Sequence, residues 1–273
     1  MKRAFLTGAV LVVITALALT ACNKGGSSGG SGGGRRSVTL TEADFKYALT
    51  DDGKGVKLLE YLGDKGGNLI IPDTFEGFPV VAIGDIDDLN SVTKLPNGEF
   101  KGFGPELTDA KIKELATSWV KTSPTARKDR ITSITIPDTV TFIGKNAFLN
   151  LPNLTSITLP KSLKVIGSSN VFQGCGITSI TIPDGVIIGT SAFYLCKTLT
   201  TLTIGENVQI MSAAFAGNSE LTTVNIPSSV RYISQSEWVI GGLKTDNDAF
   251  KDCPKLNIAT QNAIKATGYT GKF

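Results

Sequence analysis

Pairs of hydroxyl side chains recur through the second half of the chain in the pattern Ser/Thr-x-Thr. Hydroxyl groups donate and accept hydrogen bonds, so a regular array of them could bind a polysaccharide or an ordered lattice. The alternative is that threonine simply suits the solvated face of a β-strand and that the array binds nothing. The candidate ligand-binding residues are Ser133, Thr135, Ser156, Thr158, Ser179, Thr181, Thr201 and Thr203, and the pattern continues at Thr223 and Asn225.

Tryptophan is the second candidate, because it is the residue most enriched in binding hot spots. The two tryptophans of the chain, Trp119 and Trp238, both lie in segments that interrupt the repeat described below. Trp119 shares one face of a predicted amphipathic helix with Ile112, Leu115 and Ala116, so we expect it to dock on the fold. Trp238 has no such periodic apolar neighbours and is the better candidate for binding a ligand.

Residues for catalysis or metal binding are scarce. The chain has no histidine, which excludes Ser-His-Asp and Cys-His mechanisms and the commonest transition-metal ligand. Its carboxylates follow no motif that would place two across a cleft. The acidic segment 85–90 could offer oxygens to calcium, but Leu89 interrupts it. We therefore expect no enzymatic activity, no cofactor and no metal site.

The charge of the chain is nearly balanced, with 27 Lys and Arg against 24 Asp and Glu. Without Lys2 and Arg3, which precede the apolar N-terminal segment, 25 basic residues face 24 acidic ones. No long-range field then attracts a polyanion, so nucleic acid is not an expected partner.

A short segment that contains the hydroxyl pairs recurs five times at intervals of 22 or 23 residues. Such a period is typical of a solenoid, in which each unit buries its apolar edge against its neighbours. Within the segment, inward Ile alternates with outward Ser or Thr, which predicts one half-buried strand per unit and a parallel sheet along one side. The copies are ITSITIP at Ile131, LTSITLP at Leu154, ITSITIP at Ile177, LTTLTIG at Leu199 and LTTVNIP at Leu221.

After each strand come a second apolar pair, often a Gly, and then Phe preceded by Ala or Val. We expect the Phe side chains to stack in a column on the side opposite the sheet. The order L-x-x-I-x-I-P followed by V-x-x-I-G-x-x-A-F resembles the leucine-rich repeat, specifically its BspA-like branch, from about Leu69 to the C-terminus. The Asn ladder of ordinary leucine-rich repeats has no counterpart in the sequence.

The resemblance implies a leucine-rich repeat solenoid with a parallel β-sheet on one side and irregular turns on the other. It also implies binding of host or neighbouring-cell proteins, such as extracellular matrix components, through the sheet and its flanking loops. The alternatives are a non-adhesive scaffold of the cell envelope and polysaccharide binding by the Ser/Thr face. The lack of an aromatic platform for sugar rings in that face weighs against tight glycan binding.

The N-terminus resembles a bacterial lipoprotein signal peptide. Lys2 and Arg3 precede an apolar run that ends in Leu-Thr-Ala-Cys, so residues 1–21 would be removed and Cys22 would carry the lipid. An ordinary secretory signal with a coincidental Cys is the alternative. Residues 22–37 then form a Gly/Ser linker, and the membrane partner is a lipid anchor. The expected location is the bacterial cell envelope, at the outer membrane and exposed on the surface.

Between the linker and the end of the chain we expect three regions. Residues 38–68 form an N-terminal β-hairpin cap, residues 69–258 form the repeats, and residues 259–273 form a C-terminal cap with a short helix. A strand is expected to begin at Leu256–Ile258. Insertions interrupt the repeats at about 85–99, 104–130 and 235–248.

Three further cysteines, Cys175, Cys196 and Cys253, occupy the same place in their repeats, three residues after the column Phe. Other repeats carry Leu151 and Asn218 there, so we favour a small buried apolar site with free thiols. A disulfide between Cys175 and Cys196 is the alternative, since adjacent coils stack closely and the protein is expected to be exported.

Overall fold

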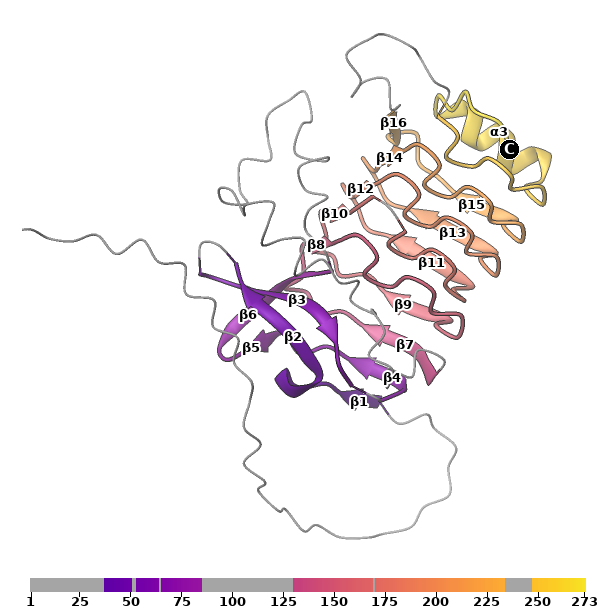
Figure 1. The fold of residues 1–273 in the computed structure, drawn as a ribbon. Helices are drawn as coiled ribbons and strands as arrows, with labels where there is room; N and C mark the ends of the chain where they lie inside the picture. Colours follow the sequence, from indigo (N-terminus) through magenta and orange to yellow (C-terminus); the bar gives the residue numbers. More distant parts are fainter. Residues whose placement is uncertain (1–36, 51–52, 64, 85–129, 169, 234–246) are drawn as a thin grey trace, which may run out of the picture. The chain divides into compact units, whose positions relative to one another are not determined.

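The computed structural model describes residues 37–50, 53–63, 65–84, 130–168, 170–233 and 247–273 (Figure 1). The chain divides into a unit of residues 1–34, which lies wholly outside the described residues, and a unit of residues 35–273. The predictions for Cys22, the acidic segment 85–90, Trp119 and Trp238 likewise fall outside the described residues.

The recurring segments stack as parallel strands, which confirms the predicted solenoid (Figure 1). The strands β1, β4, β7 and β9 form one sheet, and β11, β13 and β15 form another. The two groups adjoin where Thr178 N–H donates to Thr155 O at 3.4 Å, and together they are called the first wall here. The strands are β1 (Ser37–Thr39), β4 (Gly67–Ile70), β7 (Ile131–Thr135), β9 (Ser156–Thr158), β11 (Ser179–Ile182), β13 (Thr201–Ile204) and β15 (Thr223–Asn225).

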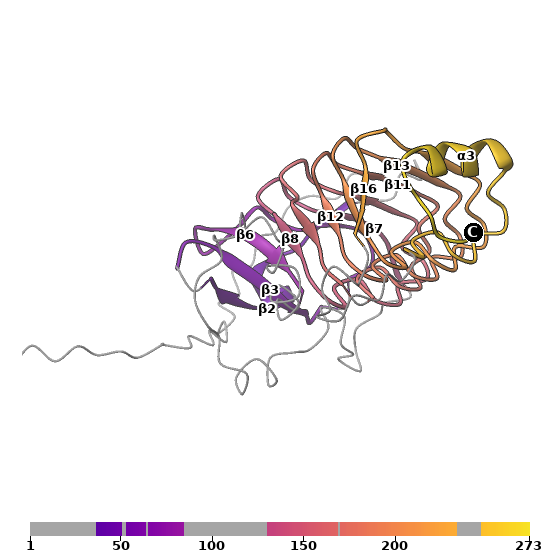
Figure 2. The ribbon, with the colours of Figure 1, turned by 90° about the horizontal axis from the view of Figure 1, so that it is seen from above.

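A second sheet runs along the coils, where the sequence predicted irregular turns. A short segment that contains Ile143, Ile166, Ile188 or Ile210 forms a strand in each of four coils, and it pairs in parallel with the same segment of the next coil (Figure 2). The β-branched residues of Val165–Ile166 and Ile187–Ile188 suit this extended backbone. Its order is β16 (Arg231–Ile233), β14 (Gln209–Met211), β12 (Ile187–Ile188), β10 (Val165–Ile166), β8 (Phe142–Ile143), β6 (Phe78–Ile83), β3 (Val56–Tyr61) and β2 (Phe45–Leu49).

The interior between the first wall and the second sheet is one continuous apolar cluster, and the predicted Phe column runs through it. Successive rings lie 4.8–5.6 Å apart with interplanar angles of 7–15°. Such stacking requires every coil to keep the same turn geometry around its Phe, so it fixes the distance between coils. The column contains Phe148, Phe172, Phe193, Phe215 and Phe250.

The backbone turns sharply on both sides of each column Phe. The residue two positions before it and the residue two positions after it adopt positive φ in most coils. This left-handed conformation is unfavourable for residues with a Cβ, and Gly and Asn tolerate it best. The positions before Phe are Asn146, Asn170, Ser191 and Ala213, and those after it are Asn150, Gly174, Leu195, Gly217 and Asp252.

The two ends of the solenoid differ. At the N-terminal end β2 and β3 pair antiparallel, as the predicted hairpin requires, while β1 extends the first wall and β3 extends the second sheet. The 3-10 helix η1 (Glu42–Asp44) precedes β2, and β5 (Thr74–Phe75) pairs with β6. At the C-terminal end, helix α3 (Ile258–Ala266) packs beside β15.

The strand predicted at Leu256–Ile258 is wrong. Asn257 is the N-cap of α3, and its side chain accepts a hydrogen bond from Thr260 N–H at 2.8 Å. An Asn at this position ends extended structure because it satisfies a free N–H of the first helical turn. Ile258 accordingly begins the helix and is exposed.

Candidate ligand-binding face

The outward side chains of the first wall form the candidate site, which we call the hydroxyl face. They alternate with inward residues such as Ile134, Ile157 and Ile180, which are buried, so the pleat turns every second side chain to solvent. The face contains Ser133, Thr135, Ser156, Thr158, Ser179, Thr181, Thr201, Thr203, Thr223 and Asn225. Ser133, Thr201 and Thr203 are half-buried and the others are exposed.

The register of the strands brings these residues into two rows. Ser133 pairs with Ser156, and Thr135 pairs with Thr158. Further along, Ser179, Thr201 and Thr223 lie in one row, and Thr181, Thr203 and Asn225 lie in the other. Neighbours within a row are therefore about 4.8 Å apart, the spacing of adjacent strands.

Most hydroxyls of the face have no intramolecular partner. Ser133 Oγ donates to Asn68 Oδ1 at 2.8 Å, and Asn225 Nδ2 donates to Thr203 Oγ1 at 3.3 Å. Thr223 Oγ1 lies 3.4 Å from Thr222 Oγ1. Within the described part of the chain, six side chains of the face make no such bond and can bind a ligand without breaking one. They are Thr135, Ser156, Thr158, Ser179, Thr181 and Thr201.

A separate column of threonines beside the face has a structural role instead. Thr155 Oγ1 donates to Thr132 O at 3.3 Å, Thr200 Oγ1 to Thr178 O at 3.0 Å, and Thr222 Oγ1 to Thr200 O at 3.1 Å. These bonds join each coil to the preceding one. The sequence pattern places Thr equally in both columns, so only the bond partners separate free hydroxyls from structural ones.

Asn68 belongs to the face although the sequence did not indicate it. It lies on β4 opposite Ser133, and its Oδ1 accepts hydrogen bonds from Ser133 Oγ and, at 3.3 Å, from Thr132 Oγ1. Its strand, GNLI, lacks the Ser/Thr-x-Thr pattern, so the only available signal was its position one unit before Ser133.

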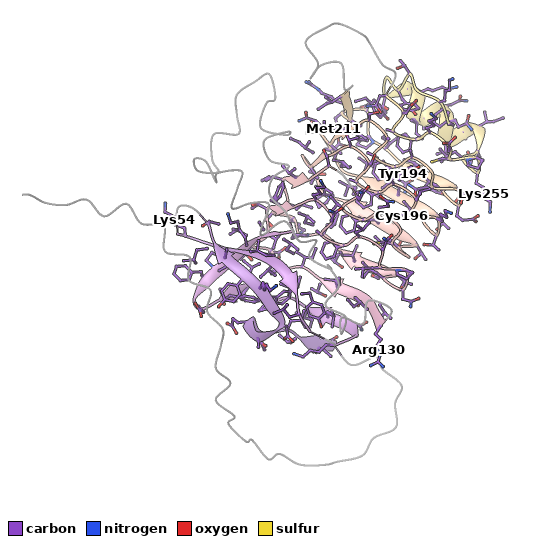
Figure 3. All side chains as sticks on the ribbon, in the orientation of Figure 1. Lys54, Arg130, Tyr194, Cys196, Met211 and Lys255 are labelled. Atoms are coloured by element: carbon purple, nitrogen blue, oxygen red, sulfur yellow. The ribbon has the colours of Figure 1, made fainter. Side chains whose placement is uncertain are left out.

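The cysteines inside the coils are free and buried, which confirms the prediction of buried thiols over a disulfide. Figure 3 labels Cys196 within the stack of coils. Burial raises the pKa of Cys196 to about 12 and that of Cys253 to about 11, and it raises the pKa of Cys175 well above its usual value. Thiols that remain protonated at neutral pH are poor nucleophiles and poor metal ligands.

The cysteine position is more than a small apolar site, because it joins the coils by hydrogen bonds. Cys175 Sγ donates to Phe148 O at 2.9 Å, and Cys196 Sγ donates to Phe172 O at 3.0 Å. Asn218 takes the same role, with its Nδ2 donating to Phe193 O at 3.2 Å. The position is buried as predicted, and the structure adds that each acceptor is the column Phe carbonyl of the preceding coil.

A metal site and a membrane span are the two other candidate features in the part of the chain that the structure describes. No group of three or more His, Cys, Asp or Glu side chains lies close enough there to hold a metal ion. None of the helices in those residues has both the length and the hydropathy needed to span a bilayer.

Residues 126–238 match, in six copies, the family described as the BspA type leucine rich repeat region. Among solved structures, a leucine-rich repeat protein of T. pallidum is 23% identical, with a TM-score of 0.54 over 86% of this chain and 99% of that one. A leucine-rich repeat protein from Bacteroides ovatus is 20% identical, with a TM-score of 0.34 over 71% of this chain and 55% of that one. The pneumococcal vaccine antigen PcpA is 20% identical, with a TM-score of 0.47 over 78% of this chain and 47% of that one. No curated protein matches the sequence significantly.

Proposed function

We propose that the protein is a binding or adhesion protein of the bacterial cell surface, because residues 126–238 match the BspA type leucine rich repeat region. It recognises an extracellular protein, such as a matrix component of a host or a neighbouring cell, through the hydroxyl face and the loops beside it. A lipid on Cys22 holds it at the outer membrane, and the Gly/Ser linker of residues 22–37 lets the repeats face outward.

The observation that carries this proposal is the set of six unpartnered hydroxyls in two rows on the first wall. The stacked Phe column and the hydrogen bonds between coils hold these rows at a fixed spacing. A ligand then loses little free energy in ordering the site, which favours affinity. The face has no charged side chain among its outward positions, so hydrogen bonding rather than ion pairing selects the ligand.

Binding of the purified mature chain to arrays of matrix proteins and glycans tests the proposal. Replacement of Thr158, Thr181 and Thr203 by Lys places three charges on the hydroxyl face, and we expect it to reduce binding at least tenfold. A matched control replaces Ser228, Asn262 and Thr270 by Lys, three exposed residues outside the face, and should leave binding unchanged. Equal binding by both variants would place the site on another surface.

The anchor and the orientation are tested on cells. We expect the Cys22→Ser variant to leave the membrane fraction, and mass spectrometry of the wild-type N-terminus to show an acylated Cys22. Protease added to intact cells should cleave the protein. Full resistance, with cleavage only after lysis, would favour an envelope scaffold with no external ligand.

A further inference from the structure

The second sheet carries a column of apolar side chains that are not part of the interior. The strand register places four of these residues side by side, and we call them the outer stripe: Ala82, Phe142, Val165 and Ile187. Ala82 pairs with Phe142, Phe142 with Val165, and Val165 with Ile187. They come from β6, β8, β10 and β12, so the outer stripe crosses four successive strands.

The outer stripe points away from the core. The next residue along each strand, Ile83, Ile143, Ile166 or Ile188, belongs to the continuous interior cluster, whereas no residue of the outer stripe does. Successive side chains of a strand point to opposite faces of the sheet. The outer stripe is nonetheless buried, with exposed fractions of 3% for Ala82, 1% for Phe142, 1% for Val165 and 2% for Ile187.

The apolar character of this column ends abruptly. The register continues from Ile187 to Gln209 and then to Arg231. Gln209 is half-buried and Arg231 is exposed. In this column, polarity and exposure therefore change together at β14, so its apolar part lies on β6, β8, β10 and β12. At the other end, Ala82 pairs with Lys57 of β3, which is also buried.

We propose that the outer stripe is the docking face for the segment of residues 85–129 of the same chain. That segment starts directly after Gly84, two residues beyond Ala82 on β6, and returns at Arg130, directly before β7 of the first wall, whose coil also contains β8. The other interruption, residues 234–246, leaves from β16 at the polar end.

The length and pattern of the segment match the outer stripe. Four parallel strands span about 14 Å, and a helix of ten residues is about 15 Å long. The predicted helix in this segment has Ile112, Leu115, Ala116 and Trp119 on one face, which gives the apolar surface that the outer stripe requires. A stripe one residue wide is too small for a stable dimer, which buries about 800 Å² per partner. The docked segment occupies the second sheet and leaves the hydroxyl face open.

Cysteine capture in the full mature chain tests this contact. Val165→Cys is combined in turn with Cys at positions 112, 115, 116 and 119, on a Cys22→Ser background, and mild oxidant is added. We expect an intramolecular disulfide with at least one partner, identified by mass spectrometry. The matched control, Thr181→Cys with the same partners, lies on the hydroxyl face and should form none. The proposal would be overturned if the Val165→Cys variants formed only dimers between chains, or no more cross-links than the Thr181→Cys variants.

A second measurement uses no cross-link. Val165→Asp puts a charge into the outer stripe, and we expect trypsin cleavage at Lys111, Lys113 and Lys121 to accelerate at least tenfold. Gln209→Asp lies in the same column beyond the apolar part and should leave cleavage at the wild-type rate. Circular dichroism shows whether each variant keeps its sheet content. Unchanged cleavage in a folded Val165→Asp variant would refute the docking.

Discussion

Gly189 lies where two adjacent coils approach closely, and a single methyl group there should destabilise the solenoid. A Cβ added to Gly189 would lie 2.4 Å from Gly167 C and from Ser168 N, both of which are backbone atoms of the preceding coil. Carbon atoms in contact normally lie about 3.5 Å apart, so the coils would have to separate by about 1 Å. Gly189 N–H donates to Ile166 O at 2.8 Å, and such a shift would stretch this bond to about 3.8 Å, beyond hydrogen-bonding distance.

The cost of Gly189→Ala follows from these two effects. Overpacking of a rigid interior costs about 1–3 kcal/mol. Loss of one buried backbone hydrogen bond adds about 0.5–1.5 kcal/mol, so we expect a total of about 2–4 kcal/mol. The Phe172 and Phe193 rings, already stacked at 4.8 Å, would also be pulled apart. For a unit of this size the change lowers the Tm by about 5–15 °C, measured by circular dichroism or calorimetry.

Gly185→Asn is the control for this prediction. Gly185 has a φ of +69°, which Asn tolerates, and nothing lies within 4 Å of its added Cβ. Its Tm should stay within about 3 °C of wild type. In the next coil, Met211 follows Ile210 as Gly189 follows Ile188, and its side chain is buried there. If Gly189→Ala also melts within about 2 °C of wild type, the coils adjust freely at this position and the packing argument fails.

Two further predictions concern the turns and the thiols. Ala213 adopts a φ of +56° at the position that Asn170 occupies in another coil. Ala213→Asn should therefore stabilise the protein by about 0.5–1 kcal/mol, and Asn170→Ala should destabilise it by a similar amount, as measured by urea unfolding. Changes of the opposite sign would refute the account of the turns. The raised pKa values of Cys175, Cys196 and Cys253 predict that iodoacetamide leaves all three unmodified at pH 8 in the folded protein and alkylates all three in urea. Above the ordinary thiol pKa of 9.0 the unfolded chain loses these protons while the folded protein keeps them, so the free energy of unfolding should fall as pH rises from about 9 toward 12. Rapid alkylation at pH 8, or a free energy of unfolding that does not change over this pH range, would show that the thiols are accessible.

Much of the fold followed from the repeat. The alternation in segments such as Ile131–Thr135 predicted the first wall and its outward hydroxyls, because a strand has a period of two and one of its faces is buried. The Phe at a constant place in each unit predicted the stacked column. The BspA-like resemblance drawn from the same residues is confirmed by the family match over residues 126–238.

The second sheet was missed because its strands are too short to show a period. Val165 and Ile166 form a strand of two residues, and alternation cannot be seen in two apolar neighbours. Only the stacking of identical coils supplies the pairing partner that makes such a segment a strand. The strand predicted at Leu256–Ile258 failed for the opposite reason, since a local cap at Asn257 took precedence over the pattern.

For the hydroxyl face too, the sequence predicted one part and the folded structure decided the other. Its residues could be named from the sequence, but Thr135 and Thr155 look alike there, and only the folded coils show that Thr155 is bonded to the preceding coil while Thr135 is free. The cysteines showed a similar limit, since their hydrogen bonds to the Phe carbonyls join residues more than twenty positions apart in the chain.

By itself, the sequence determined the solenoid, the direction in which each side chain of the first wall points, and the stacked Phe column, because these depend on a pattern repeated within every unit. The tertiary structure alone decided which hydroxyls remain unpaired, that Gly189 admits no side chain, and that Phe142 and Val165 are covered on the outside of the second sheet. These properties depend on distances between coils. The distance between residues 22 or 23 positions apart becomes fixed only when each coil has packed on the one before it.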